Sequence, residues 1–196
     1  MDQISKYDFE YPKNLIGLDP LKNRQEARML VSNQEGFVHD KVGNFTDYLT
    51  KDDLLVFNNT KVIPCRLKAK VYKNINNNSV LKVEVTLNKL ESKKIWSSFC
   101  LPGRKVNVGD VLEFENDFFA KVVKISNGLY FLKFNKVYDD LIKSLEKIGK
   151  MPIPPYILKK RGFRESDFEN YQTTFAEHNG SVAAPTASLH FDKNLF

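Results

Sequence analysis

Cysteine is scarce in this sequence of 196 residues, which contains only Cys65 and Cys100. Two cysteines are too few for a disulfide scaffold, and neither belongs to a Cys-x-x-Cys pair of the kind that binds zinc. We therefore expect two reduced thiols in or near strands, and no metal site. The chain also lacks an apolar run long enough to cross a bilayer and a signal-peptide core at its N-terminus. The sequence thus predicts a cytoplasmic protein that does not enter a membrane.

Several common catalytic signatures are missing as well. The sequence contains no Walker loop, dinucleotide fingerprint or serine-hydrolase elbow. What it does contain is lysine, concentrated in the middle of the chain: residues 61–160 carry 20 basic and 9 acidic side chains, whereas the net charge of the whole chain is only +6. This segregation favours a middle segment that binds a polyanion. The alternative is a solvated, lysine-rich surface without a ligand.

Short β-branched and aromatic runs follow one another through this basic segment. Turn residues separate six of them, which are Arg66–Tyr72, Val80–Leu87, Ile95–Cys100, Val111–Phe114, Phe118–Ile125 and Leu129–Phe134. Ser126-Asn127-Gly128 predicts a tight type I′ hairpin, because Asn and Gly tolerate positive φ angles. Six short strands at this spacing predict a small antiparallel barrel or sandwich.

The segments on either side of the predicted barrel mix helices and strands. Asp53–Phe57 is a continuous apolar run between polar residues, which is typical of a strand buried on both faces. Tyr138–Ile148 has an apolar stripe at helical spacing, and Gly149 is placed to end that helix. Ser166–Glu169 has the pattern of a capping box at the start of a second helix. We therefore expect a mixed α/β domain that a barrel interrupts.

Three segments differ from ordinary packing sequences. The asparagine segment (Asn58–Arg66) follows the predicted buried strand, where α/β proteins place ligand contacts; a simple turn is the alternative. The proline segment (Gly149–Ile157) has three prolines in four positions, which predicts an extended wall beside a pocket or a domain connector. The small-residue segment (Gly180–Phe191) permits close backbone approach to a nucleotide or its ribose. It includes His190, which is either a proton carrier or a structural histidine.

Taken in order, these segments resemble those of a known family. Asp53–Leu67, Gly149–Ile157, Tyr171–Ala176 and Gly180–Phe191 are similar to landmark motifs of the S-adenosylmethionine:tRNA ribosyltransferase-isomerases. The opening Tyr7–Pro12 is similar to that family too. The resemblance extends over essentially the whole chain.

The resemblance implies a reaction on tRNA. The ribose of S-adenosylmethionine would be transferred and isomerised onto 7-aminomethyl-7-deazaguanine at the wobble position, giving epoxyqueuosine, while adenine and methionine leave. S-adenosylmethionine is then a consumed substrate, and neither a cofactor nor a metal is expected. The implied fold is an α/β catalytic domain interrupted by a barrel, with residues 1–62 before it, 63–148 forming the barrel and its trailing helix, and 149–196 returning to the catalytic domain.

The resemblance also implies roles for individual residues. His190 is the candidate base or proton shuttle, and Asn58 and Asn59 are the other candidate catalytic residues. The candidate substrate-binding residues are Thr60, Lys61, Arg66, Pro152, Pro154, Tyr156, Tyr171, Gln172, Ala184, Pro185 and Thr186. Two positions depart from the family pattern: Lys61 replaces an arginine, and Ser188 replaces a glycine, which puts close ligand approach or a positive φ angle in doubt there.

The family continues for nearly as many residues again, so the resemblance covers only its N-terminal part. Asp192 could cap a helix, of which Lys193–Phe196 would form one turn at most, far below the length of a stable isolated helix. We therefore expect the α/β domain to be incomplete, with a second polypeptide supplying the other half. The alternatives are a truncated, inactive remnant and a non-catalytic RNA-binding module.

Overall fold

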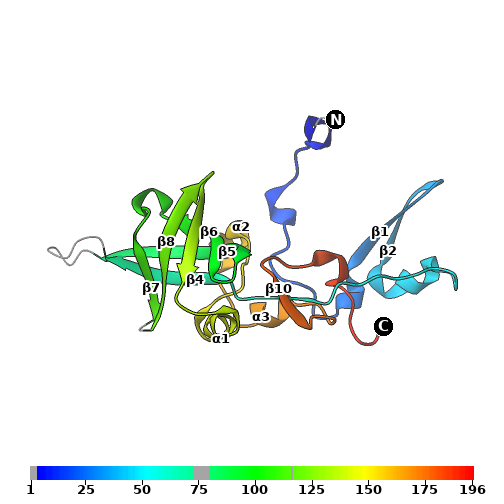
Figure 1. Ribbon diagram of the computed structural model, residues 1–196. Helices are drawn as coiled ribbons and strands as arrows, with labels where there is room; N and C mark the ends of the chain where they lie inside the picture. The colour runs from blue at the N-terminus through cyan, green and yellow to red at the C-terminus, as the bar shows by residue number, and fades with distance from the viewer. Residues whose placement is uncertain (1–3, 73–79, 116) are drawn as a thin grey trace.

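The computed structural model describes residues 4–72, 80–115 and 117–196 (Figure 1). Its largest unit is a closed antiparallel barrel in which the strands follow the order β4-β5-β6-β9-β8-β7. These strands are β4 (Arg66–Tyr72), β5 (Val80–Ser92), β6 (Ile95–Leu101), β7 (Val111–Glu115), β8 (Phe118–Ser126) and β9 (Leu129–Phe134). The six predicted strands and the predicted barrel are thus confirmed. The turn residues expected between the first two predicted strands (74–79) and before Phe118 (residue 116) lie outside the described residues.

Alternation along the strands fills the barrel interior. In β5, Val83, Val85 and Leu87 are buried while the residues between them are more exposed, as a strand with one core face requires. The aromatic side chains of Phe118 and Phe134 complete the same core. The predicted type I′ turn between β8 and β9 is also confirmed, because Asn127 and Gly128 have φ angles of 51° and 75°.

Helix α1 (Tyr138–Ile148) follows the barrel with the predicted bounds. Its apolar stripe is buried against the barrel core through Leu141, Ile142 and Leu145. Gly149 ends the helix by donating its N–H to the carbonyl of Leu145, but its φ angle of −74° is not left-handed. The glycine is needed for another reason. A Cβ at this position would lie 2.0 Å from the carbonyl oxygen of Pro64.

The rest of the chain forms smaller elements beside the barrel. Strands β1 (Arg28–Asn33) and β2 (Gly36–Lys41) form a hairpin, and β3 (Thr60–Val62) pairs in parallel with β10 (His178–Ser181). The helices are α2 (Pro155–Arg161) and α3 (Asp167–Asn170), and short 3-10 turns occur at Ile4–Tyr7, Lys13–Leu15, Arg24–Glu26, Val42–Tyr48, Gly103–Lys105 and Thr186–Ser188. Figure 1 shows β10 and α3 between the barrel and the β1–β2 hairpin. The chain is therefore a mixed α/β structure with few helices.

The prediction of a buried strand at Asp53–Phe57 is wrong. This segment forms no strand, and the side chains of Leu54 and Val56 are 86% and 85% exposed. Residues 54–58 make no backbone hydrogen bond to any other described residue. A strand buried on both faces needs a neighbouring strand on each side and covering layers. The described chain supplies neither to this segment.

Two smaller predictions also need correction. Ser166 does not form a capping box, because its backbone is already helical and its side chain makes no cap bond; the carboxylate of Asp167 instead accepts the N–H of Arg164 at 2.9 Å. The proline segment is extended only as far as Pro154. Pro155 begins α2, which is possible because the first residue of a helix needs no N–H donor.

Cys65 and Cys100 are both free, one immediately before β4 and the other within β6. Burial raises the pKa of each thiol to about 12. Both therefore stay protonated at neutral pH and are poor nucleophiles. In the described part of the chain, no helix is long and apolar enough to span a membrane. Nor do the described side chains include a group of three metal-ligating residues placed to hold an ion.

Candidate ligand site where four motifs meet

The asparagine segment and the start of the small-residue segment meet in the β3–β10 pair. The register places Thr60 opposite His178. Just before it, the carbonyl of Asn59 accepts the backbone N–H groups of Glu177 and His178, at 2.9 and 3.1 Å. The structure thus brings together two candidate segments that are more than a hundred residues apart in the sequence.

Gln172 binds the other edge of β3. Its side-chain amide accepts the N–H of Val62 at 2.9 Å and donates to the carbonyl of Val62 at 2.7 Å. This pair of bonds imitates a neighbouring strand and satisfies both backbone groups of a buried residue. The structure therefore gives Gln172, a predicted substrate-binding residue, a role in holding the site together.

A small apolar cluster lies beneath this pairing. Val62, Met151 and Ile153 are almost fully buried, and the partly buried ring of Tyr171 packs against them. Burial raises the pKa of the Tyr171 hydroxyl. The cluster joins the proline segment to β3. Pro152 and Pro154, both half-buried, lie on either side of the buried Ile153. Tyr156, by contrast, is exposed on α2.

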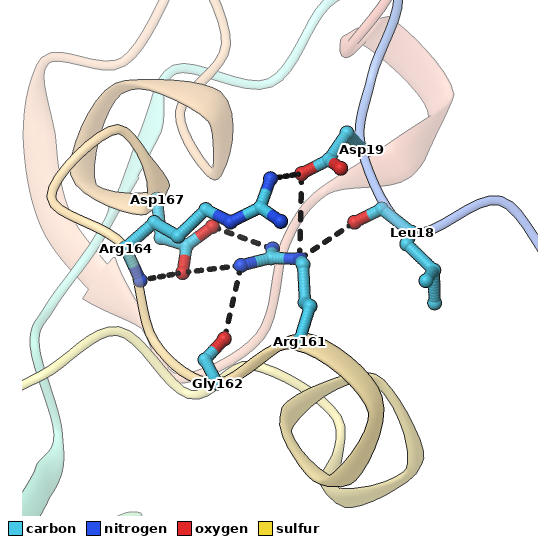
Figure 2. Close-up of polar contacts among 6 residues, drawn as sticks. All are labelled: Leu18, Asp19, Arg161, Gly162, Arg164 and Asp167. Carbon is cyan, nitrogen blue, oxygen red and sulfur yellow. Dashed lines mark hydrogen bonds and ion pairs between the residues drawn. The ribbon is translucent and has the colours of Figure 1, made fainter.

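An ion pair fixes α2 and α3 beside this cluster. Figure 2 shows the guanidinium of Arg161 facing the carboxylate of Asp167, with Nη2 2.6 Å from one oxygen and Nη1 3.1 Å from the other. Arg161 Nε also donates to the carbonyl of Leu18 at 2.8 Å, and Arg164 pairs with Asp19. The N-terminal segment is therefore held against the α2–α3 turn.

Two residues near the N-terminus hold the small-residue segment. Arg24 Nη1 donates to the carbonyls of Leu189 at 2.9 Å and Gln172 at 3.3 Å. Gln25 Nε2 donates to the carboxylate of Asp192 at 2.9 and 3.0 Å. The N–H of Leu195 also donates to that carboxylate and lowers the pKa of Asp192, which caps the final turn as predicted. Neither contact could be predicted from the sequence, because neither leaves a local pattern there.

The candidate catalytic residues have polar groups that reach solvent. His190, Asn58 and Asn59 are all exposed. His190 has no hydrogen-bonding partner among the described residues, whereas the amide of Asn59 donates to Glu177 at 3.4 Å. In the small-residue segment, Ala184 and Pro185 are half-buried and Thr186 is exposed. An exposed imidazole and exposed amides are able to exchange protons with a ligand and to hydrogen-bond it.

The two cationic residues among the candidate substrate-binding residues already have protein partners. Arg66 donates to the carboxylate of Glu84 and, at 3.4 Å, to the carbonyl of Ile153. Lys61 lies 3.7 Å from a carboxylate oxygen of Glu146, and both side chains are partly exposed. A ligand would have to share or displace these carboxylates.

Ser188, where the family pattern has glycine, does not require a glycine backbone. Among the described residues, Asn127 is the one non-glycine residue with a positive φ angle, so Ser188 is not strained in that way. Its side chain is buried, however, and its hydroxyl has no hydrogen-bonding partner; the same is true of Thr173. An unsatisfied buried hydroxyl costs about 1–3 kcal/mol.

Comparison with known proteins identifies the family that shares these motifs. A family model described as queuosine biosynthesis protein matches residues 4–196. The chain belongs to this family. The motifs that meet around Val62 therefore belong to a queuosine biosynthesis protein.

Relatives in the queuosine biosynthesis family match nearly all of this chain but are longer. The chain is 39% identical to the S-adenosylmethionine:tRNA ribosyltransferase-isomerase of Ruegeria pomeroyi and 38% identical to that of Rickettsia bellii, covering 98% of its own length and 56% of each relative. A solved S-adenosylmethionine tRNA ribosyltransferase from Thermotoga maritima is 31% identical, with 80% of this chain and 54% of that one covered and a TM-score of 0.35. The chain thus spans about half the length of the relatives it matches.

Proposed function

We propose that the chain forms part of an S-adenosylmethionine:tRNA ribosyltransferase-isomerase. In that reaction the ribose of S-adenosylmethionine is transferred and isomerised onto 7-aminomethyl-7-deazaguanine at the tRNA wobble position, giving epoxyqueuosine. The observation that carries the proposal is the meeting of the asparagine, proline and small-residue segments around β3 and β10, with Gln172 joining them. Segments with only a structural purpose would not need exposed amides at Asn58 and Asn59, directly before β3, next to small residues that pair with that strand.

The proposed chemistry begins at the sulfonium of S-adenosylmethionine. Its positive charge acidifies the neighbouring ribose carbon, so that a base nearby can remove a proton and start the rearrangement. We assign the base to His190, which is exposed and has no hydrogen-bonding partner among the described residues. Asn58, Asn59 and Thr60 would orient the ribose or the tRNA base. Thr186, also exposed, would contact the ligand beside Ala184 and Pro185.

We further propose that the barrel is inserted into the catalytic domain, with boundaries at residues 62–63 and 148–149. Support comes from the backbone, because Arg66 and Lys150 hydrogen-bond each other in both directions, at 3.1 and 2.8 Å. The chain therefore enters and leaves the barrel at one place. Residues before and after the barrel then pair as β3 and β10.

The proposed activity requires the part of the family that this chain does not match. Support comes from the exposed apolar side chains of Leu54 and Val56, on a segment without backbone partners. A second polypeptide that pairs with this segment would complete the α/β domain. The partners are then tRNA, S-adenosylmethionine and that polypeptide, and the site of action is the cytoplasm, where tRNA is modified.

Release of adenine from S-adenosylmethionine tests the proposal. The chain would be incubated with substrate tRNA, alone and together with a separately expressed polypeptide that corresponds to the unmatched half of the Ruegeria pomeroyi relative. We expect release that depends on tRNA and on the added polypeptide. His190→Ala should abolish it, whereas His39→Ala, which changes an exposed histidine in the β1–β2 hairpin, should not. An active His190→Ala variant would remove His190 from the chemistry, and binding of tRNA without release in either mixture would favour the RNA-binding module.

A further inference from the structure

Three lysines gather around a cavity on the barrel. The cavity measures about 500 Å³, and its lining includes Lys68 and Lys70 of β4 and Lys82 of β5. Leu101, Phe114, Glu84 and Glu113 contribute the remaining large side chains. All three lysines are exposed, and none has an ion pair or a hydrogen bond with another described residue. The cavity therefore holds three ammonium groups that form no direct ion pair with the two carboxylates of its lining.

The strand register places two of these charges side by side. Lys70 lies directly opposite Lys82 in the antiparallel β4–β5 pair. Like charges in this arrangement destabilise a sheet, because directly opposite side chains are the closest neighbours on its surface. Lys70 also lies directly opposite Glu113 in the β4–β7 pair, and Lys68 lies opposite Glu84, so these two carboxylates offset part of the repulsion between the lysines.

The carboxylates of the cavity are engaged elsewhere. Glu84 accepts a hydrogen bond from Arg66, and Glu113 accepts one from the hydroxyl of Tyr72 at 2.7 Å. Counting Arg66, four cations surround two carboxylates. The local charge therefore stays positive.

A second, smaller cavity continues the first toward the candidate ligand site. It measures about 200 Å³, shares Lys68, Glu84 and Phe114 with the larger cavity, and adds Arg66, Lys150 and the carboxylate of Glu115, which is paired with Lys147. Lys150 belongs to the proline segment, and its backbone is bonded to Arg66. Five cations thus follow one path, which we name the basic groove: Lys82, Lys70, Lys68, Arg66 and Lys150.

We propose that the basic groove binds the phosphodiester backbone of tRNA and guides it from the barrel to the candidate ligand site. This inference rests on the proposed function and adds where the RNA lies. A line of cations in a concave groove complements a linear polyanion, and such contacts position RNA without reading its sequence. A membrane surface would instead favour an amphipathic helix with a broad apolar face.

The proposed binding of tRNA by the basic groove is tested with a fluorescent tRNA transcript and the full 196-residue chain. Fluorescence anisotropy measures the binding at several salt concentrations. The test variant is Lys70→Gln/Lys82→Gln. The matched control is Lys121→Gln/Lys133→Gln, because those exposed lysines are also directly opposite each other, in β8 and β9, and line neither cavity. We expect about tenfold weaker binding for the test variant, with a salt slope reduced by about 1.5, and less than a twofold change for the control.

Each outcome supports or overturns the groove. Equal weakening in both double variants would mean that overall charge, and not the groove, attracts the RNA. Tight binding by the test variant would overturn the groove and leave the proposed function standing, whereas a wild-type chain that binds no tRNA would overturn both. The test variant should melt within a few degrees of the wild type, because the change removes both the repulsion between Lys70 and Lys82 and the attraction between Lys70 and Glu113. If the double variant melts much lower, tRNA binding by the single variants Lys70→Gln and Lys82→Gln replaces it as the test. If phosphatidylserine vesicles displace the tRNA, and Lys70→Gln/Lys82→Gln weakens vesicle binding, the proposal of an RNA ligand would be overturned in favour of a membrane surface.

Discussion

Arg161 and Asp167 form the most buried ion pair in the described chain, with side chains 7% and 2% exposed. Burial alone would raise the pKa of Asp167, but hydrogen bonds from Arg161 and from the N–H of Arg164 outweigh it, and the pKa of this carboxyl is lowered. The hydrogen bond to Asp167 correspondingly raises the pKa of Arg161. Each charge is therefore stable in the interior only while its partner is present.

Arg161→Met should lower the free energy of unfolding at pH 7 by about 3–5 kcal/mol, because the carboxylate of Asp167 would remain buried without its partner. Since the pKa of Asp167 is lowered by folding, its contribution is present above the unfolded value of about 3.9 and is lost as the pH falls through the folded value. The difference between wild type and variant should therefore shrink in acid. Urea unfolding between pH 7 and pH 3 measures both effects.

The control for this prediction is Arg104→Met, which removes an exposed arginine from the barrel. It should change stability by no more than about 0.5 kcal/mol. A pH-independent difference between wild type and Arg161→Met would contradict the electrostatic explanation and leave only lost packing.

Several residues of the candidate site could be predicted from the sequence as members of motifs, but their contacts could not. Gln172 is bonded to Val62, 110 positions away, and Arg24 to Leu189, 165 positions away. Neither contact has a periodicity or a turn signal, because each depends on how distant segments pack. The buried, unpaired hydroxyls of Thr173 and Ser188 could not be predicted from the sequence either, because serine and threonine are common at the surface.

At the scale of elements, prediction succeeded where a local pattern determines the structure. The barrel strands alternate between core and solvent, and Tyr138–Ile148 repeats its apolar residues at helical spacing, so both were correctly predicted. The apolar run Asp53–Phe57 was wrongly predicted because burial on two faces depends on partners that local sequence does not specify. Ser166 failed as a cap because its own backbone is already helical, and its side chain makes no cap hydrogen bond.

The end of α1 provides a prediction at this scale. Gly149→Ala should lower the free energy of unfolding by about 1–3 kcal/mol, because the added Cβ would lie 2.0 Å from the carbonyl oxygen of Pro64 and 2.6 Å from that of Leu145. Both are backbone atoms and cannot move away cheaply. Thermal or urea unfolding measures the loss.

Gly17→Ala is the matched control, because nothing lies within 4 Å of its added Cβ and its φ angle is not positive. Gly149→Asn separates the two explanations for the glycine. Because the φ angle of Gly149 is −74°, asparagine gains nothing from its tolerance of left-handed caps, and its Cβ meets the same two carbonyl oxygens. Gly149→Asn should therefore destabilise at least as much as Gly149→Ala, and a stable variant would contradict crowding.

The whole molecule divides its apolar surface unevenly. The barrel encloses most of the buried core, whereas the segments outside it expose large apolar side chains. Examples are Phe9, Phe37, Leu54 and Val56, each more than two-thirds exposed. Leu54 and Val56 lie in one segment without backbone partners, which is the surface that we propose the second polypeptide covers.

Hydrogen exchange should report this division. Peptides that contain residues 54–58 should exchange at the rate of unprotected amides, because those residues make no backbone hydrogen bonds within the described chain, and peptides from β8 and β9 should be strongly protected. Mass spectrometry of quenched digests measures both. Adding the unmatched half of a relative should slow exchange at residues 54–58, and protection there without it would contradict the structure.

The paired bonds between Arg66 and Lys150 also have an evolutionary and practical consequence. In an antiparallel pair the two α-carbons lie about 5 Å apart, so a linker of two or three residues would close the gap left by deleting everything between them. On the proposed insertion, an ancestor without the barrel would acquire it with little displacement of the backbone on either side. The same junction is the natural place to exchange this barrel for another small domain, or to graft it into an unrelated host.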